Sequence, residues 1–149
     1  MSGKYERDME FDRKSKIKLE SAPDVLTDYY YNLIGSGKSY RTAYNYICYI
    51  MNFINFIYKR CPNDFYLNIK PSHINKYISS LRVKTTNGEV KPTSDSFKTI
   101  HWSALNSFFQ FLVPDYITSN PVASTQRPKM KDNPKVTYLT SEEISDVLK

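Results

Sequence analysis

The sequence is poor in glycine and cysteine, and these shortages already narrow the possible folds. It has 149 residues with only 4 glycines and 2 cysteines, and 40% of its residues are apolar. So little glycine at that apolar content favours a helical fold. Cys48 and Cys61 fall far apart along one predicted helix, so we expect no disulfide between them. Reduced thiols are typical of a cytoplasmic protein.

The sequence also lacks the patterns of a metal site, a leader peptide and a membrane span. Neither the cysteines nor His73 and His101 have the spacing of zinc ligands, and no cofactor is expected. The charged N-terminus has no apolar core of the kind found in signal peptides. The apolar run Tyr46–Tyr58 is too short to cross a bilayer, and Asn52 and Asn55 interrupt it. We therefore expect no membrane partner.

Positive charge and aromatic side chains, by contrast, are abundant. The net charge is +6, and the chain has 13 tyrosines and 8 phenylalanines. This charge favours a polyanionic partner, of which nucleic acid is the commonest. A basic soluble protein without such a partner would have the same charge, so the charge alone does not decide. The aromatic side chains supply ample material for a core.

The longest segment with a single period runs from Ser39 to Arg60. Its apolar and polar side chains fall on opposite faces of a helix. The apolar positions are Ala43, Tyr46, Ile47, Ile50, Phe53, Ile54 and Ile57, and the polar ones are Arg41, Asn45, Cys48, Asn52, Asn55 and Lys59. Ser39 is placed to cap this helix, and Pro62 follows its end. The apolar stripe requires other helices to cover it.

Three more helices are predicted, which makes the fold all-α with four helices. They are expected at 21–35, 71–82 and from Thr93 or Ser94 to about Val113. Residues 65–69 are expected to be an extended link. The polar loop 83–92 contains a turn sequence at 85–88 that could form the tip of a hairpin.

The two ends of the chain differ in composition from the predicted helical region, 21–121. Residues 1–20 have little periodicity and are expected to be a flexible charged arm. Residues 122–136 are rich in proline and basic residues, which is typical of an interdomain linker. At 137–149, Thr140 and Glu143 form a capping box before a new apolar run. Because a new element opens there and the chain stops, the sequence resembles a fragment of a longer protein.

Three stretches carry a pattern known from one family. They are Ser39-x-x-Thr42-x-x-x-Tyr46-x-x-x-Ile50-x-x-Phe53-x-x-Phe56, then Trp102-Ser103-Ala104-Leu105-Asn106-Ser107-Phe108-Phe109-Gln110-Phe111-Leu112 followed by Ile117 and Asn120-Pro121, and finally Tyr138-Leu139-Thr140-Ser141-Glu142-Glu143-Ile144. The first resembles the second helix of the core-binding domain of tyrosine recombinases, the phage integrase family. The second is similar to that domain's fourth helix and exit. The third is similar to the opening of the family's catalytic domain, and each motif alone is a loose helix-packing pattern.

The resemblance implies a four-helix, SAM-like domain that clamps one face of double-stranded DNA in the integrase of a phage or another mobile element. In that family the nucleophilic tyrosine and its helpers belong to the catalytic domain, beyond Lys149. The resemblance therefore implies a chain that binds DNA for integration and recombination but does not cleave it. Such a chain has no catalytic residue, no cofactor and no small-molecule substrate, and it could self-associate on DNA.

The candidate DNA-binding residues lie at two helix starts and in the linker. They are Ser39, Tyr40, Arg41, Thr42 and Asn45 in the long helix, Ser94, Lys98, Thr99 and His101 in the fourth, and Arg127, Lys129 and Lys131 in the linker. Where the family usually has a threonine three residues after the serine of the fourth helix, this chain has Phe97. Alternatively, the hydroxyls are only caps, the cations are solvated, and the linker is a tether.

Two other functions remain open from the sequence. The first is a stand-alone helical DNA-binding or regulatory module without a catalytic partner. The second is a helical protein-interaction module whose aromatic side chains dock a partner. Salt-sensitive binding to DNA would favour the first over the second.

Overall fold

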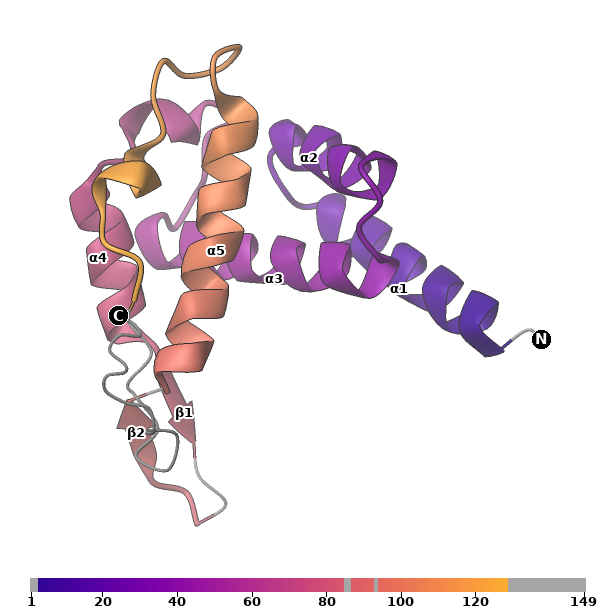
Figure 1. Ribbon diagram of the computed structural model, residues 1–149, viewed down its shortest axis with the longest axis horizontal. Coiled ribbons are helices and arrows are strands. Elements are labelled where there is room, and N and C mark those ends of the chain that lie inside the picture. The colour runs from indigo at the N-terminus through magenta and orange to yellow at the C-terminus, as the bar shows by residue number, and fades with distance from the viewer. Residues whose placement is uncertain (1–2, 85–86, 93, 129–149) are drawn as a thin grey trace, which may run out of the picture.

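The computed structural model describes residues 3–84, 87–92 and 94–128, and these are mostly helical (Figure 1). The helices are α1 (Gly3–Leu19), α2 (Asp24–Gly35), α3 (Tyr40–Ile57), α4 (Pro71–Ser80) and α5 (Asp95–Leu112), with short 3-10 helices η1 (Phe65–Asn68) and η2 (Pro121–Ser124). The all-α class and the four predicted helices, α2 to α5, are confirmed. The predicted stretch 137–149 lies outside the described residues.

Helix α3 is the centre of the fold, as its long apolar stripe predicts. Helix α5 crosses it, with α1 and α2 on one side of α5 and with α4 and η2 on the other (Figure 1). Five residues of the predicted α3 stripe are buried: Ala43, Ile47, Ile50, Phe53 and Ile54. They pack with aromatic side chains of the other helices, including the edge-to-face pairs that Phe53 forms with Tyr77 and Phe109. One continuous core results.

The expectation of a flexible arm at residues 1–20 is wrong, because α1 is a docked helix of 17 residues. It packs against both α3 and α2. Ser15 and Leu19 are buried, and the Tyr30 hydroxyl donates a hydrogen bond of 2.6 Å to Asp12. The sequence shows little periodicity here because, apart from Leu19, the buried face uses a serine and a hydrogen-bonded carboxylate where large apolar side chains would give a repeat.

Smaller corrections concern the predicted boundaries. Helix α3 ends at Ile57 and not at Arg60, and α4 ends at Ser80 and not at Arg82. The expected extended link at 65–69 is instead the 3-10 helix η1, whose Phe65 is fully buried against the stacked ring of Phe108. Burial of that ring explains why the segment turns inward, which alternation in so short a stretch does not reveal.

The polar loop after α4 forms the expected hairpin. Strands β1 (Arg82–Lys84) and β2 (Val90–Pro92) pair antiparallel, with Val83 opposite Lys91. Gly88 has a positive φ of 90°, which L side chains rarely adopt and glycine adopts freely. The hairpin extends from the junction between α4 and α5, beside the end at which α5 begins (Figure 1).

Candidate nucleic-acid interface

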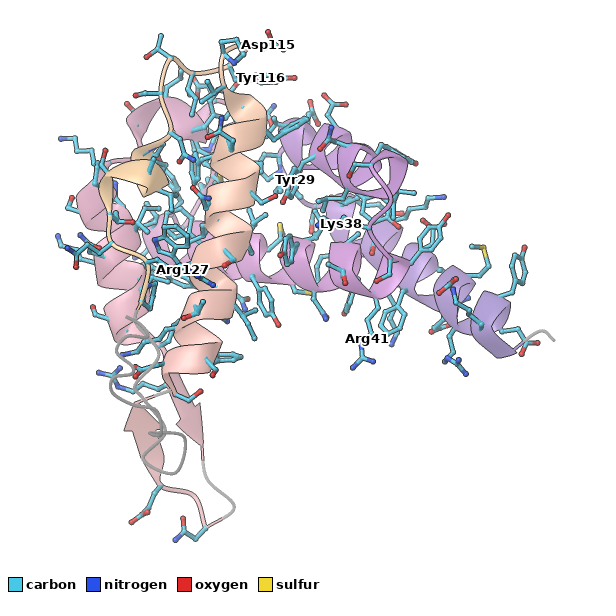
Figure 2. All side chains as sticks on the ribbon, in the orientation of Figure 1. Tyr29, Lys38, Arg41, Asp115, Tyr116 and Arg127 are labelled. Carbon is cyan, nitrogen blue, oxygen red and sulfur yellow. The ribbon has the colours of Figure 1, made fainter. Side chains whose placement is uncertain are left out.

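The first turn of α3 exposes hydrogen-bond donors and one arginine. Ser39 caps the helix, since its hydroxyl oxygen accepts from the Thr42 amide at 3.0 Å and its hydroxyl donates to Thr42 Oγ1 at 3.0 Å. Arg41 is exposed and its side chain points away from the other helices (Figure 2). No acidic residue occupies this first turn. Because the amides of a first turn carry partial positive charge, this end of α3 favours an anion.

The residue before the cap was not singled out from the sequence. Lys38 is exposed in the loop between α2 and α3 (Figure 2). Its amide donates to the Leu33 carbonyl at 3.0 Å, and Gly37 has a φ of 99°, so the chain reverses sharply before α3. The run Gly35-Ser36-Gly37 predicts a break between helices, and the reversal places Lys38 beside the Ser39 cap. A Gly-Ser-Gly break followed directly by a lysine and a capping serine is the sequence pattern that could have revealed it.

Tyr40 and Asn45, also predicted as contacts, are both half-buried. Tyr40 lies near Tyr30 and Lys16, on the side of α3 that faces α1 and α2. Asn45 follows Arg41 by four residues, which places both on one face of the helix. The structure therefore groups Asn45 with Arg41 and separates Tyr40 from them.

The start of α5 repeats the cap but is more covered. The Ser94 hydroxyl oxygen accepts from the Phe97 amide at 3.2 Å, so of the two residues predicted as the cap, Ser94 is the one used. Lys98 is half-buried. Thr99 is only 7% exposed, and its hydroxyl lies 2.8 Å from the Asp95 carbonyl and 3.2 Å from the Pro128 carbonyl. Thr99 is thus engaged inside the protein, which argues against the expected contact with DNA.

His101 is a core residue, which argues against the expected contact with DNA. It is 2% exposed, and its ring lies 4.3 Å from the Tyr49 ring and 4.5 Å from the Phe97 ring, measured between centroids. Its Nδ1 is 3.0 Å from the Tyr77 hydroxyl, while Nε2 has no hydrogen-bond partner. Burial lowers the pKa of His101 to about 4, because the apolar surroundings disfavour the charged ring.

The first part of the predicted linker is folded against α5. Helix η2 packs on α4 and α5, and the indole Nε1 of Trp102 donates to Thr125 Oγ1 at 2.8 Å. Together with the bond from Thr99 to Pro128, this contact runs the segment back along α5 toward its start. Arg127 is exposed on that segment, beside α5 (Figure 2). Up to Pro128 the predicted linker therefore packs on the domain, which argues against the alternative of a solvated tether there, and its role as an interdomain linker stays a prediction. Lys129 and Lys131 lie outside the described residues.

A contact between two aromatic rings locates the start of α5 relative to α3. The Tyr49 ring of α3 lies 6.4 Å from the Phe97 ring in the first turn of α5. Tyr49 follows Arg41 by roughly two turns, or about 12 Å along α3. The contact between Tyr49 and Phe97 therefore places the start of α5 beside α3, roughly two turns beyond Arg41. Of the predicted residues that the structure describes, Thr99 and His101 are buried, and the others remain at least partly exposed.

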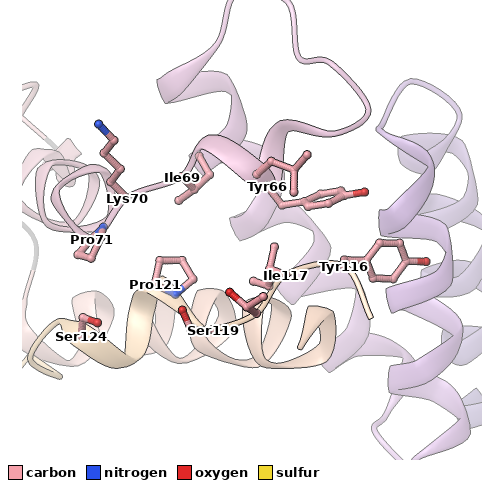
Figure 3. A pocket seen from close by; sticks show the side chains of 11 residues that line it. Tyr66, Ile69, Lys70, Pro71, Tyr116, Ile117, Ser119, Pro121 and Ser124 are labelled. Atoms are coloured by element: carbon pink, nitrogen blue, oxygen red, sulfur yellow. The ribbon is translucent and has the colours of Figure 1, made fainter. Parts of the chain in front are cut away.

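A pocket occurs near the other end of α5. It has a volume of about 450 Å³ and opens between η1, the start of α4 and the chain that follows α5 (Figure 3). Tyr66, Ile69, Lys70, Tyr116 and Ile117 are among its lining residues. None of the candidate DNA-binding residues that the structure describes lines it.

The described residues contain no cluster of three His, Cys, Asp or Glu side chains that could hold a metal ion. Within the same residues, no helix is both long and apolar enough to traverse a bilayer. Cys48 and Cys61 are free thiols, and burial raises the pKa of Cys61 to about 11. A raised thiol pKa leaves little reactive thiolate at neutral pH.

Comparison with known protein families gives one match. Residues 26–118 match the family described as the phage integrase, N-terminal SAM-like domain. The match runs from the first turn of α2 to a few residues beyond α5, and it covers well over half of the chain. No curated protein and no solved structure matches the chain. The chain therefore belongs to the phage integrase N-terminal SAM-like domain family, the family of tyrosine recombinases.

Proposed function

We propose that this domain binds double-stranded DNA as the DNA-binding part of a site-specific tyrosine recombinase. The observation that carries the proposal is that two serine-capped helix starts, those of α3 and α5, lie on neighbouring helices, with the first turn of α5 beside Tyr49, roughly two turns from Arg41. Each start offers free backbone amides and at least one cation, the combination that binds phosphate oxygens. Membership of the integrase family supports DNA as the anion.

In this proposal, the starts of α3 and α5 hold the phosphates that border one major groove. Arg41 supplies charge at the first start, and Lys98 and Arg127 supply it at the second. Asn45 is the candidate for a base contact, since an amide side chain can both donate to and accept from a base edge. The domain would bind at the recombination core site in the cytoplasm, with cleavage left to a catalytic domain and with self-association occurring on the DNA.

The proposal is tested by fluorescence anisotropy of a labelled random-sequence duplex at several salt concentrations. The parent chain should bind in the micromolar range or more weakly, with affinity that falls steeply as salt rises. Arg41→Ala and Lys98→Ala should each reduce the slope of log affinity against log salt by about one unit.

Lys70→Ala is the matched control, because it removes the same charge at the pocket near the other end of α5. Its slope should match that of the parent. Absence of binding by the parent at low salt would contradict the proposed function. Equal slopes in all three variants would contradict this placement of the DNA.

A further inference from the structure

Helix α1 lies outside the matched residues, yet it lies directly beside the surface described above. The match begins at residue 26, whereas α1 ends at Leu19. Helix α1 packs along α3, and both helices begin on the same side of the molecule (Figure 1). The rings of Phe11 and Tyr44 join the two helices, with centroids 5.7 Å apart. Because Tyr44 follows Arg41 by three residues, this contact lies one turn from Arg41.

The charges of α1 are divided unequally around the helix. Three of its carboxylates form ion pairs within the helix: Asp8 with Lys4 at 3.4 Å, Asp12 with Lys16 at 3.0 Å, and Glu10 with Arg13. Three cations of α1 have no acidic partner among the described residues, namely Arg7, Lys14 and Lys18. Three acidic residues of α1 therefore each neutralise one cation, whereas Glu6 and the cations Arg7, Lys14 and Lys18 have no ion-pair partner among the described residues.

The three uncompensated cations share one flank of α1. Arg7, Lys14 and Lys18 are separated by seven and four residues, so they line up along the helix. Phe11 lies in the same row, and the Lys14 ammonium is 5.6 Å from the centroid of its ring. Since the Phe11 ring also contacts Tyr44, this row borders the face of α3 that carries Arg41.

The row is held in place by buried contacts on the neighbouring face of α1. Ser15 is fully buried and Leu19 is 8% exposed, and Asp12 accepts the hydrogen bond from Tyr30. Because the side chain of Ser15 is small, a neighbouring helix can pack closely on α1 at this position. Because α1 is docked, its cations lose little freedom when they meet an anion, which favours binding.

We propose that Arg7, Lys14 and Lys18 form a second row of phosphate contacts, which extends the DNA-binding surface of α3 beyond the family domain. The inference rests on the proposed function, because it assigns further contacts to the same duplex. The Arg41 row and the α1 row would bind phosphates on one side of the bound groove. The bound stretch of DNA would then be longer than the domain at 26–118 can cover.

The test uses the full chain and the same labelled duplex. Replacing all three residues, Arg7→Gln, Lys14→Gln and Lys18→Gln, should lower the salt slope by about two to three units, since each phosphate that is no longer neutralised accounts for roughly 0.9. The site size, in base pairs per bound chain at saturation, should be smaller for this variant than for the parent. A conservative variant, R7K with K14R and K18R, should keep the slope and the site size of the parent.

The matched control removes the same charge from the paired set, with Lys4→Gln, Arg13→Gln and Lys16→Gln. Its slope should change by less than one unit, because those cations are neutralised within α1. Far-UV circular dichroism of each variant verifies that the helices remain folded. Equal reductions of slope in both triple variants would overturn the inference, since only net charge would then matter. If the parent binds and Arg41→Ala weakens it while the first triple variant does not, this inference alone fails.

Discussion

Helices α3 and α5 begin in the same way but end up in different surroundings. Both have 18 residues and a serine cap. The start of α3 has no acidic residue and leaves Arg41 exposed, whereas the start of α5 carries Asp95 and is covered by residues 125–128. The same local sequence feature thus gives an open anion site in one helix and a partly occupied one in the other. The residues that pack around each first turn, and not the serine cap, therefore determine how much of that turn is accessible to a ligand.

The largest expected effect concerns the core that α3 and α5 share. Phe53→Ala should lower the free energy of unfolding by about 3–5 kcal/mol, since Phe53 is fully buried between Tyr77 and Phe109. Phe56→Ala on the same helix is the control, because Phe56 is 46% exposed and should cost far less. Urea unfolding measures both. Equal stability of Phe53→Ala and the parent would mean that the helices do not meet at this ring.

The second prediction concerns the histidine that α5 buries and α3 covers with Tyr49. Burial lowers the His101 pKa to about 4, below that of an unfolded histidine, so the unfolded chain binds the proton more readily. The free energy of unfolding therefore keeps the full contribution of neutral His101 above about pH 6.5. As the pH falls from there toward 4, the free energy of unfolding decreases by roughly 2–3 kcal/mol.

A His101→Phe variant should show a shallower loss of stability over this range, because the ring at this position no longer titrates. Urea unfolding between pH 7 and pH 4.5 measures the difference. Phe also removes the hydrogen bond with the Tyr77 hydroxyl, so the shape of the pH profile, and not the absolute stability, is the readout. Parallel profiles for variant and parent would contradict the assignment.

The smallest expected effect tests the segment that distinguishes α5 from α3. Thr125→Val removes the acceptor of the Trp102 indole and should cost about 1 kcal/mol. Because Trp102 is the single tryptophan of the chain, tryptophan fluorescence reports on the surroundings of this one indole. Thr125→Ser keeps the hydroxyl and serves as the control. If the emission of both variants equals that of the parent, residues 125–128 do not cover α5 in solution.

The sequence predicts the helices and caps better than it predicts exposure. The 3.6-residue period of α3 and the serines before α3 and α5 are local features, and each appears as expected. Burial of His101 depends on Tyr49 and Tyr77, which come from two other helices. No local sequence pattern predicts that these three side chains pack together. The polar residues at the start of α5 would be equally suited to a solvent-exposed surface.

Helix α1 escaped prediction for a related reason. Its contact with α2 and α3 uses Ser15, Asp12, Phe11 and Leu19, of which only the last two are apolar. The alternation of signs along α1 is typical of a solvated arm until the ion pairs are located. Once they are located, the uncompensated cations stand out, and the sequence did contain their spacing of seven and four.

A continuous stretch of α3 separates Arg41 from Tyr49, the residue that contacts the start of α5. The direction in which Arg41 points therefore depends on the number of residues in that stretch. Inserting one residue between Arg41 and Tyr49 would lengthen the separation by only about 1.5 Å. It would also rotate Arg41 by roughly 100° around the axis, toward a different face of the molecule. Within this stretch, an insertion would change the direction of the arginine far more than its distance. The length of α3 between these two residues therefore fixes the orientation of Arg41 relative to the start of α5.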